Sequence, residues 1–196
     1  GLEKLQVVTM QAISGAGKNT QLDIEDNILC DILNETSKIA SEPKKILGLY
    51  NHGKIVDLPL HTSVQCYRVP VNTGHLMHIT LQCSSAPTID DVLEAFEDFN
   101  NKSSQLPLYS SPSKLIYYFE EKERPQPKYQ RLLGNGMSIS IGNLKVSKEF
   151  GIQFTLLVDN LIRGAAGAAL LNAELLVHKK ESSFNLLKKK LPQLQC

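Results

Sequence analysis

The order of the predicted elements places this chain of 196 residues in the α+β class. Helical and β-like segments are mixed along the chain, without the strict strand–helix–strand alternation of doubly wound proteins. Two β-like runs, at 64–71 and 75–83, are separated by Asn-Thr-Gly. This spacing predicts a β-hairpin in which Gly74 takes a positive φ. Both observations favour a sheet that contains antiparallel pairs.

The N-terminal part of the chain predicts a strand followed by two helices. Residues 5–13 are rich in Val, Thr and Ile, which is typical of a strand. Apolar residues spaced along 23–33 predict an amphipathic helix. A second, short helix is expected to start near Ser41, because Pro43 is tolerated only in a first turn, and to stop at Gly48.

The rest of the chain predicts a capped helix, three strands and a final helix. Thr88 is the expected cap of a helix that reaches residue 99, with acidic residues in its first turn. The proline-rich "RPQPK" segment is expected to be extended and exposed. The further strands are predicted at 114–119, 137–146 and 152–158, and the final helix at 161–178. We predict one domain over 1–180 and a basic C-terminal tail over 181–196.

Composition narrows the classes of function. The formal net charge is +1 at pH 7, with 42% hydrophobic and 21% charged residues, so neither nucleic acid nor an anionic membrane is an expected partner. No apolar run spans a bilayer and no leader is recognisable. The four cysteines form no CxxC or other close pair, which indicates a reducing compartment, although four cysteines could also form two disulfides in an extracellular protein. No metal site is expected. A cytoplasmic protein is the expectation.

The stretch "MQAISGAGKNTQ" (residues 10–21) resembles a phosphate-binding loop only at first sight. A P-loop requires a glycine where Ala12 stands, and Ser or Thr where Asn19 follows Lys18. The third glycine of a dinucleotide-binding fingerprint is also missing. The segment is therefore a glycine turn at a strand end. Gln11 and Ser14 can meet a ligand there, although turn formation alone also explains the pattern.

Two charged pairs are the candidates for chemistry. Arg68 and His75 lie on opposite arms of the predicted hairpin. They would offer a bidentate fork for a carboxylate or phosphate and a proton shuttle near neutral pH. Isolated residues of these types are usually a surface charge and a satisfied polar group. Glu42 and Lys45 are neighbours on a helix face, which fits either an exposed ion pair or a site for a small anion.

Six motifs resemble one family when taken together and in order. They are "TMQAISGAG", "EPKKILG", "RVPVNTGH", "RPQP", "GNGMSISIG" and "NLIRGAAGAALLNAELL". The chain from about Leu5 to Leu176 resembles the C-terminal, substrate-binding half of aspartate-semialdehyde dehydrogenases of the fungal and archaeal type. The resemblance implies a large, mixed, mainly antiparallel sheet covered on one face by helices, similar to the C-terminal domain of glyceraldehyde-3-phosphate dehydrogenase. It also implies a homodimer formed through the sheet face.

The resemblance implies an NADP-dependent reaction that interconverts aspartate 4-semialdehyde plus phosphate with aspartyl 4-phosphate, through a cysteine thioester. His75 would be the general acid and base. A small anionic amino-acid substrate and phosphate would be held by four residues, with Arg68 on the carboxylate, Glu42 on the amino group, Lys45 on the phosphate and Gln11 orienting the substrate. Asn160, Ser14 and Gly15 would lie near the cofactor.

This chain departs from the family pattern at two points. The nucleophile belongs to an "NCST"-like motif, which is absent here, as are the glycine fingerprint and the N-terminal NADP-binding domain. Cys66 shares a strand face with Arg68, but it is better explained as a small buried apolar residue. We therefore expect the chain alone to be inactive and not to bind NADP tightly.

Two alternatives to this family reading stay open. The chain could be a non-catalytic descendant kept for dimerisation or ligand binding. It could also be a reductase of another acyl phosphate or thioester, for which the Glu42 carboxylate would be unnecessary.

Overall fold

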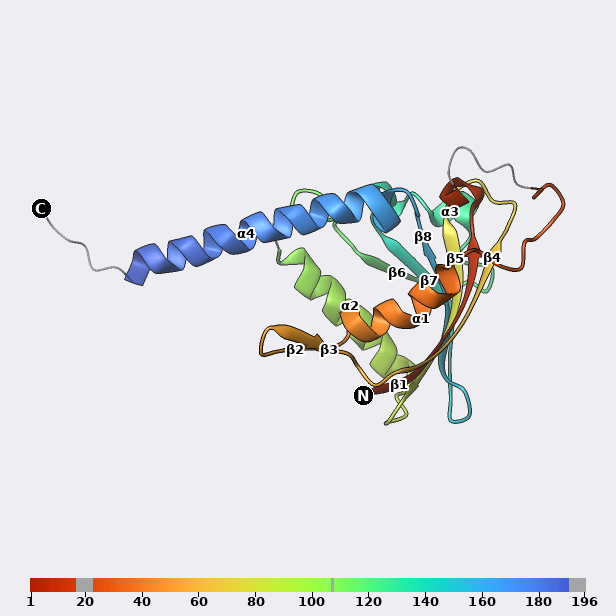
Figure 1. Cartoon of the computed structure of the whole chain (residues 1–196), viewed down its shortest axis with the longest axis horizontal. Helices are drawn as coiled ribbons and strands as arrows, with labels where there is room; N and C mark the ends of the chain where they lie inside the picture. Colours follow the sequence, from red (N-terminus) through yellow and green to blue (C-terminus); the bar gives the residue numbers. More distant parts are fainter. Residues whose placement is uncertain (17–22, 107, 191–196) are drawn as a thin grey trace, which may run out of the picture.

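The computed structural model describes residues 1–16, 23–106 and 108–190, with 181–190 described as backbone alone. Its centre is a six-stranded mixed sheet in the order β4-β1-β5-β8-β7-β6 (Figure 1). The strands are β1 (Leu2–Gln11), β4 (His61–Arg68), β5 (His75–Cys83), β6 (Ile116–Phe119), β7 (Ile139–Ser147) and β8 (Gly151–Val158). The three central pairs are antiparallel, whereas β1–β4 and β6–β7 are parallel. This confirms the α+β class and the mixed, mainly antiparallel sheet.

The predicted hairpin between residues 64–71 and 75–83 is wrong. Both runs are strands, but β1 lies between them, parallel to β4 and antiparallel to β5. Gly74 does take a positive φ of 101°. A local hairpin loses to this arrangement because inserting β1, whose Leu5 and Val7 are buried, joins both strands to a larger sheet. The loop from 69 to 74 therefore crosses the end of β1.

Helices cover one face of the sheet. They are α1 (Glu35–Ile46), α2 (Ile89–Ser104) and the long α4 (Gly167–Lys190), all on the left side of the sheet in Figure 1. A small hairpin of β2 (Leu49–Asn51) and β3 (Lys54–Val56) follows α1. Short turns of helix complete the chain: a 3-10 turn at Ile13–Ala16, α3 (Pro127–Gln130), a 3-10 turn at Leu133–Gly136 and a π turn at Ile162–Ala166.

The core lies between the sheet and these helices. Alternate residues of β1 are buried, as a strand with one covered face requires. One cluster joins Val92 of α2 to Phe154 and its neighbours on β7 and β8, and a second joins Leu5 and Val7 to Ile39 of α1. At the end of β1 this inward alternation continues to Gln11, so a polar side chain takes the last core-facing position.

Helix α2 forms as predicted. The Thr88 hydroxyl accepts a hydrogen bond from the Asp91 amide at 3.2 Å, and the Asp91 carboxylate accepts one from the Thr88 amide at 2.7 Å. This reciprocal capping box satisfies amide groups that the first turn of a helix leaves free. The helix is thus defined by its local sequence.

The two predicted helices between residues 23 and 48 are wrong in their boundaries. Within 23–33 no helix forms, because Leu29 pairs with Arg68 through two backbone hydrogen bonds of 2.9 and 3.0 Å and so extends the free edge of β4. Helix α1 begins instead at Glu35 and contains Pro43 near its C-terminal end. Apolar residues of the 29–33 segment face a pocket and not a helix interface.

Two C-terminal expectations also change. The "RPQPK" segment is not simply extended and exposed: Pro125 is buried after a cis peptide bond, and Pro127 starts α3. Helix α4 continues well past residue 178, to Lys190. Residues 191–196 of the predicted tail lie outside the described residues, and the domain boundary at 180 stays a prediction. No helix in the described part of the chain is long and apolar enough to cross a membrane.

Candidate functional site

The backbone amides of the turn that follows β1 are hydrogen-bonded to carbonyl groups of the protein. The Ile13 and Ser14 amides donate to the carbonyl oxygens of Val71 and Asn72 at 2.9 and 3.2 Å, and the Gly15 amide donates to Ala12 at 3.1 Å. A phosphate-binding loop needs such amides to be free for the ligand. Residues 13–15 of this turn are therefore fastened to residues 71, 72 and 12, whereas residues 17–21 of the stretch lie outside the described residues.

Three of the predicted site residues meet around this turn because β1 lies between β4 and β5. Arg68 pairs with Gln11 in the sheet register, and His75 begins the strand on the other side. The Arg68 Nη1 donates to the Ala12 carbonyl at 2.8 Å, while the Ala12 amide donates to His75 Nδ1 at 3.2 Å. The backbone N–H and C=O of Ala12, the residue directly after β1, thus orient both side chains.

The environment of His75 disfavours its charged form. Burial and the nearby Arg68 guanidinium lower the pKa of His75 from 6.5 to about 4, against the opposing pull of Glu35 and Asp159. The ring is therefore neutral at pH 7. Because Nδ1 accepts from Ala12, the single ring proton belongs on Nε2. Burial also lowers the pKa of Arg68, a change that Glu35 partly counters.

Gly15 allows the turn to lie directly over these two side chains. A Cβ at this position would stand 2.9 Å from Arg68 Nη1 and 3.2 Å from His75 Cε1. The first distance is shorter than real Cβ contacts, so the site requires glycine for close approach. This is a packing requirement, because Gly15 is not among the glycines with a positive φ.

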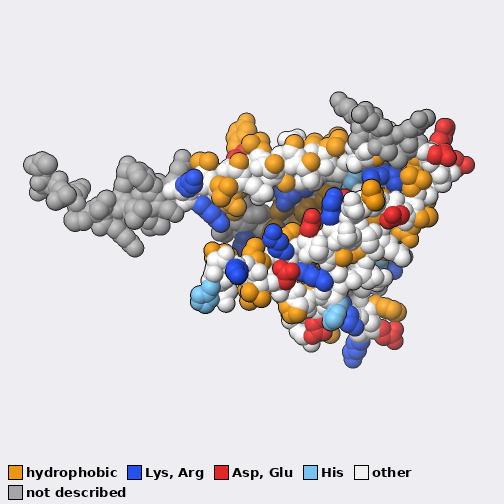
Figure 2. All heavy atoms as spheres, viewed as in Figure 1, with side chains coloured by type: hydrophobic (Ala, Val, Ile, Leu, Met, Phe, Trp, Pro, Cys, Tyr) orange, Lys and Arg blue, Asp and Glu red, His pale blue; other side chains and the backbone are white. Residues whose placement is uncertain are grey.

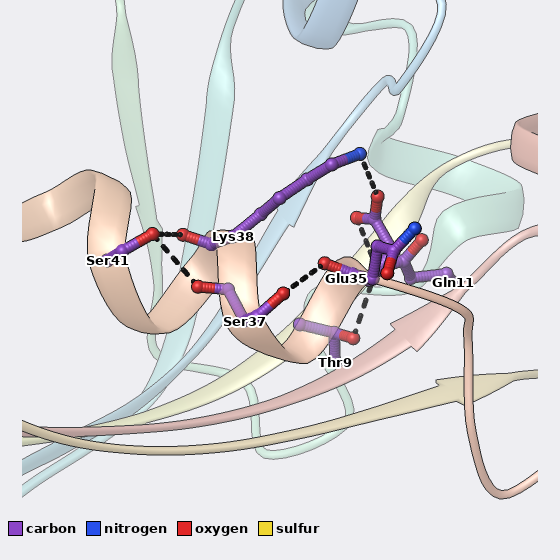
Figure 3. Close-up of polar contacts among 7 residues, drawn as sticks. Thr9, Gln11, Glu35, Ser37, Lys38 and Ser41 are labelled. Carbon is purple, nitrogen blue, oxygen red and sulfur yellow. Dashed lines mark hydrogen bonds and ion pairs between the residues drawn. The ribbon is translucent and has the colours of Figure 1, made fainter.

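Helix α1 brings a carboxylate and an ammonium group to Gln11. The Gln11 Nε2 donates to Thr9 Oγ1 at 3.4 Å and to Glu35 Oε2 at 3.5 Å, and the Lys38 Nζ donates to Glu35 Oε1 at 3.0 Å (Figure 3). The hydrogen bond from Lys38 is the main cause that lowers the pKa of Glu35. At neutral pH the cleft therefore contains an ionised carboxylate beside the amide of Gln11.

Glu42 and Lys45 do not reach this cleft, so their predicted position there is contradicted. Both are exposed and line a separate pocket beside the β2–β3 hairpin. Helix α1 rises by about 1.5 Å per residue, which carries Glu42 roughly 10 Å beyond Glu35 along the axis. The motif "ETSK" at the start of α1 has the same acid-to-lysine spacing as "EPKK". That repeated spacing was the available signal for Glu35 and Lys38.

The strand-to-helix junction after β8 supplies the opposite wall. Asn160 Oδ1 accepts the Gly74 amide at 2.8 Å, and Asn160 Nδ2 donates to the Ser14 hydroxyl at 3.0 Å. Its amide thus links the end of β8, the loop before His75 and the turn after β1. Asn160 and Ser14 are brought together, as the sequence led us to expect, and Gly15 adjoins them.

Two pockets meet at Gln11, Gly15, Glu35 and His75, which line both of them. The first, of about 580 Å³, is completed by Arg68, Asp31 and the apolar side chains of 29–33. The second, of about 500 Å³, extends to Asn160 and to the small residues Gly164 and Ala165. A charged pocket thus adjoins a flatter, less polar one, with His75 between them.

No cysteine lines either pocket among the described residues. Cys66 is 1% exposed and packs on the covered face of β4, one inward position before Arg68, whereas Cys30 is exposed. Within the same residues no group of three His, Cys, Asp or Glu side chains could hold a metal ion. The cleft contains a base and charged binding groups without a thiol.

Comparison with known proteins identifies the family of this chain. Residues 1–163 match the family model of the semialdehyde dehydrogenase dimerisation domain. Aspartate-semialdehyde dehydrogenases of Archaeoglobus fulgidus and Schizosaccharomyces pombe are 40% and 42% identical over 182 and 186 residues. These alignments cover 92% and 91% of this chain and 52% of each relative, so the chain spans about half the length of the curated relatives it matches.

Solved structures share the fold. The crystal structure of aspartate semialdehyde dehydrogenase with NADP from Candida albicans superposes with a TM-score of 0.82 at 34% identity, over 92% of this chain and 52% of that one. The Vibrio cholerae aspartate semialdehyde dehydrogenase II complexed with ASA gives a TM-score of 0.70 at 21% identity, over 90% of this chain and 55% of that one. From the match over 1–163 and the shared fold, the chain belongs to the semialdehyde dehydrogenase dimerisation-domain family.

Proposed function

We propose that this chain is the substrate-binding half of an NADP-dependent aspartate-semialdehyde dehydrogenase. The reaction interconverts aspartate 4-semialdehyde plus phosphate with aspartyl 4-phosphate through a cysteine thioester. The observation that carries the proposal is the convergence of Arg68, His75, Gln11 and Glu35 around one turn, in a chain of this family. The protein is expected in the cytoplasm.

The first pocket suits a small amino acid with a free carboxylate. Arg68 is 5% exposed, and its Nη1 donates to the Ala12 carbonyl. Its remaining guanidinium N–H groups can therefore bind a carboxylate. Glu35 lines the same pocket and would hold the substrate amino group, with Gln11 orienting the substrate. We assign to Glu35 and Lys38 the roles predicted for Glu42 and Lys45, so that Lys38 would meet the phosphate.

His75 is the proposed acid and base. Its neutral ring would donate Nε2–H to the aldehyde-derived oxygen as negative charge develops there, and recover the proton in the reverse direction. The Ala12 amide keeps the ring in this tautomer and orientation. Arg68 favours the neutral ring electrostatically, so substrate recognition and proton transfer are coupled through these two residues.

The second pocket fits the reactive end of NADP, which would supply hydride transfer. Asn160, Ser14 and Gly15 would lie beside it, and the small side chains at Gly164 and Ala165 leave room for a flat ring. These few contacts do not amount to a nucleotide site, so NADP would not bind tightly to this chain alone. The thiol must likewise come from polypeptide outside these 196 residues, and we expect the isolated chain to be inactive.

Binding tests the substrate assignment without requiring turnover. Calorimetry with this chain should show that aspartate 4-semialdehyde binds more tightly than succinic semialdehyde, which lacks the amino group, and than 3-aminopropanal, which lacks the carboxylate. Equal affinity for all three compounds would contradict the proposal. Activity can be restored in a fusion of this chain to the N-terminal half of the Schizosaccharomyces pombe relative, with NADPH absorbance as the readout.

A non-catalytic descendant is the second candidate, favoured by the lining of both pockets, which contains no cysteine in the part of the chain that the structure describes. It predicts a folded fusion protein that binds aspartate 4-semialdehyde no better than its two truncated analogues. The leading proposal predicts selective binding and turnover in the same fusion protein.

A further inference from the structure

Asp159 is a buried acid with no predicted role. It follows β8 directly, and only 2% of its surface is exposed. A carboxylate is almost never fully buried unless hydrogen bonds or charges compensate for its lost hydration. The contacts of Asp159 therefore indicate what the residue does.

Those contacts all lie on the junction between β8 and α4. The Asp159 Oδ1 accepts the amides of Leu161 and Ile162 at 2.9 and 2.8 Å, and the Asp159 carbonyl accepts the amide of Gly164 at 2.9 Å. Leu161 is the N-cap of the π turn, and Ile162 and Gly164 lie in its first residues, where amides have no acceptor within the helix. One residue thus fixes the backbone on the C-terminal side of Asn160.

This junction carries the side chain that closes the cleft. Asn160 lies between Asp159 and the amides that Asp159 holds, and its own amide reaches Gly74 and Ser14. Gly74 immediately precedes His75. Any rotation of the junction would move Asn160 away from both partners and release the backbone beside His75.

The Asp159 carboxylate also acts electrostatically on the His75 ring. Three charged groups act on His75: the Arg68 guanidinium on one side, and the Glu35 and Asp159 carboxylates opposing it. Of the two acids, Glu35 has the larger effect on His75, and Asp159 is the more deeply buried.

We propose that Asp159 is a positioning residue of this site: it holds the junction that directs Asn160 onto Gly74 and Ser14, and its negative charge acts on His75 from behind that junction. The inference rests on the proposed function only in treating the cleft as catalytic. A substrate contact by Asp159 is not implied.

Two substitutions separate the hydrogen-bonding part from the charge. Asp159→Asn keeps an oxygen that can accept the Leu161 and Ile162 amides, whereas Asp159→Ala removes it. The matched control is Asp91, whose carboxylate caps α2 through Thr88 far along the chain from the cleft. Asp91→Asn and Asp91→Ala therefore change a capping carboxylate of the same kind at an exposed position.

NMR of the isotope-labelled chain provides both readouts. In Asp159→Ala we expect hydrogen exchange of the Gly74 amide to become roughly tenfold faster, as loss of a cap loosens the junction, while Asp159→Asn stays near the wild-type rate. In Asp159→Asn we expect the pKa of His75 to fall below its value of about 4, because an opposing negative charge is lost. Neither Asp91 variant should change either quantity.

Unchanged Gly74 exchange in Asp159→Ala would overturn the positioning role. A His75 pKa in Asp159→Asn equal to that in Asp91→Asn would overturn the electrostatic role. If Asp159→Ala does not fold, the Asp159→Asn titration still decides the second point, and a weakened Gly74–Asn160 contact in that folded variant would contradict the first. Both readouts are independent of ligand binding, so failure of the proposed function would not alter them.

Discussion

At the scale of single residues, His75 should make the stability of the fold depend on pH. Its pKa is about 4 in the folded chain and near 6.5 in the unfolded chain. Between pH 4 and 6.5, His75 is therefore protonated in the unfolded chain but neutral in the folded chain. The stability contribution is fully present above pH 6.5 and is lost as the pH falls toward 4. The loss is at most about 3 kcal/mol, reduced by partial solvent screening of the ring.

Urea unfolding of the wild type and of His75→Gln at several pH values would measure this dependence. The wild type should lose more free energy of unfolding between pH 6.5 and 4.5 than the variant does. Glu35, whose pKa is lowered, loses its contribution only as the pH falls below the usual carboxyl range, and it does so in both proteins. Identical slopes for the two proteins would show that His75 is not held neutral.

A second residue-scale prediction concerns Gly15. Gly15→Ala should displace the Arg68 and His75 side chains, because its Cβ would stand within 2.9 Å of Nη1. The free energy of unfolding should fall by no more than about 1–2 kcal/mol, since flexible side chains can yield. Binding of aspartate 4-semialdehyde, measured by calorimetry, should weaken roughly tenfold, equivalent to about 1.4 kcal/mol.

Gly53→Ala is the matched control for that experiment. Gly53 has a φ of 81°, so alanine is strained there, but nothing lies within 4 Å of the added Cβ. We expect Gly53→Ala to lower the free energy of unfolding by about as much as Gly15→Ala does, and to leave ligand binding unchanged. If both variants weaken binding equally, the effect of Gly15→Ala is a general loss of stability and not a displacement of the site.

At the scale of elements, α1 offers two acid–lysine pairs with the same spacing but different surroundings. Glu35→Gln should weaken binding of aspartate 4-semialdehyde at least tenfold while leaving succinic semialdehyde unaffected, because a hydrogen bond to a charged group contributes about 1.5–3 kcal/mol. Glu42→Gln should change neither affinity, since Glu42 lines a different pocket. Calorimetric titration of both variants decides which pair recognises the amino group.

The cap of α2 supports the fold without touching the site. Thr88→Ala removes the hydroxyl that accepts the Asp91 amide and should lower the free energy of unfolding by about 0.5–2 kcal/mol. Thr88→Ser, which keeps the hydroxyl, should retain most of the wild-type free energy of unfolding. Ligand binding should stay at the wild-type level in both Thr88 variants. A loss of binding in Thr88→Ala at full folding would link α2 to the cleft.

At the scale of the whole molecule, the sheet has one face that helices leave open. The face opposite α1, α2 and α4 carries the short α3 and its neighbouring loop beside β7 and β8 (Figure 1). On the same face, pointing away from the buried Leu5 and Val7, the strands β1, β4 and β5 present residues such as Gln6, Ser63 and His78. On the other side, Figure 2 shows a hollow between α4 and the body of the molecule, with Lys and Arg side chains around it. The open sheet face is the proposed dimer surface.

Light scattering should therefore give a mass of two chains in solution. His78→Glu, near the middle of the open face, should shift the equilibrium toward the single chain because it would bury like charges across a two-fold interface. Glu94→Gln, exposed on α2 on the opposite side, should leave the mass unchanged. A single-chain mass for the wild type at micromolar concentration would contradict the proposal.

Local sequence patterns were enough to identify every strand of the main sheet and the capped helix α2. Strands alternate or run apolar, and the Thr88–Asp91 box is complete within four residues, so neighbours along the chain carry the information. The same patterns failed at 23–33, where apolar spacing suits a helix but the free edge of β4 offers backbone partners to an extended segment. The spacing of apolar residues within a segment carries no information about the free edge of β4, which is remote in the sequence.

The sequence by itself determined which side chains are available to the cleft, because Arg68, His75, Gln11, Ser14 and Asn160 stand out by type and motif. The tertiary structure decided how they meet. Insertion of β1 between β4 and β5 places the backbone of Ala12 against both Arg68 and His75, and the start of α1 selects Glu35 over Glu42. These outcomes depend on sheet order and on where a helix begins relative to the sheet, and both are set by packing between segments remote in the chain.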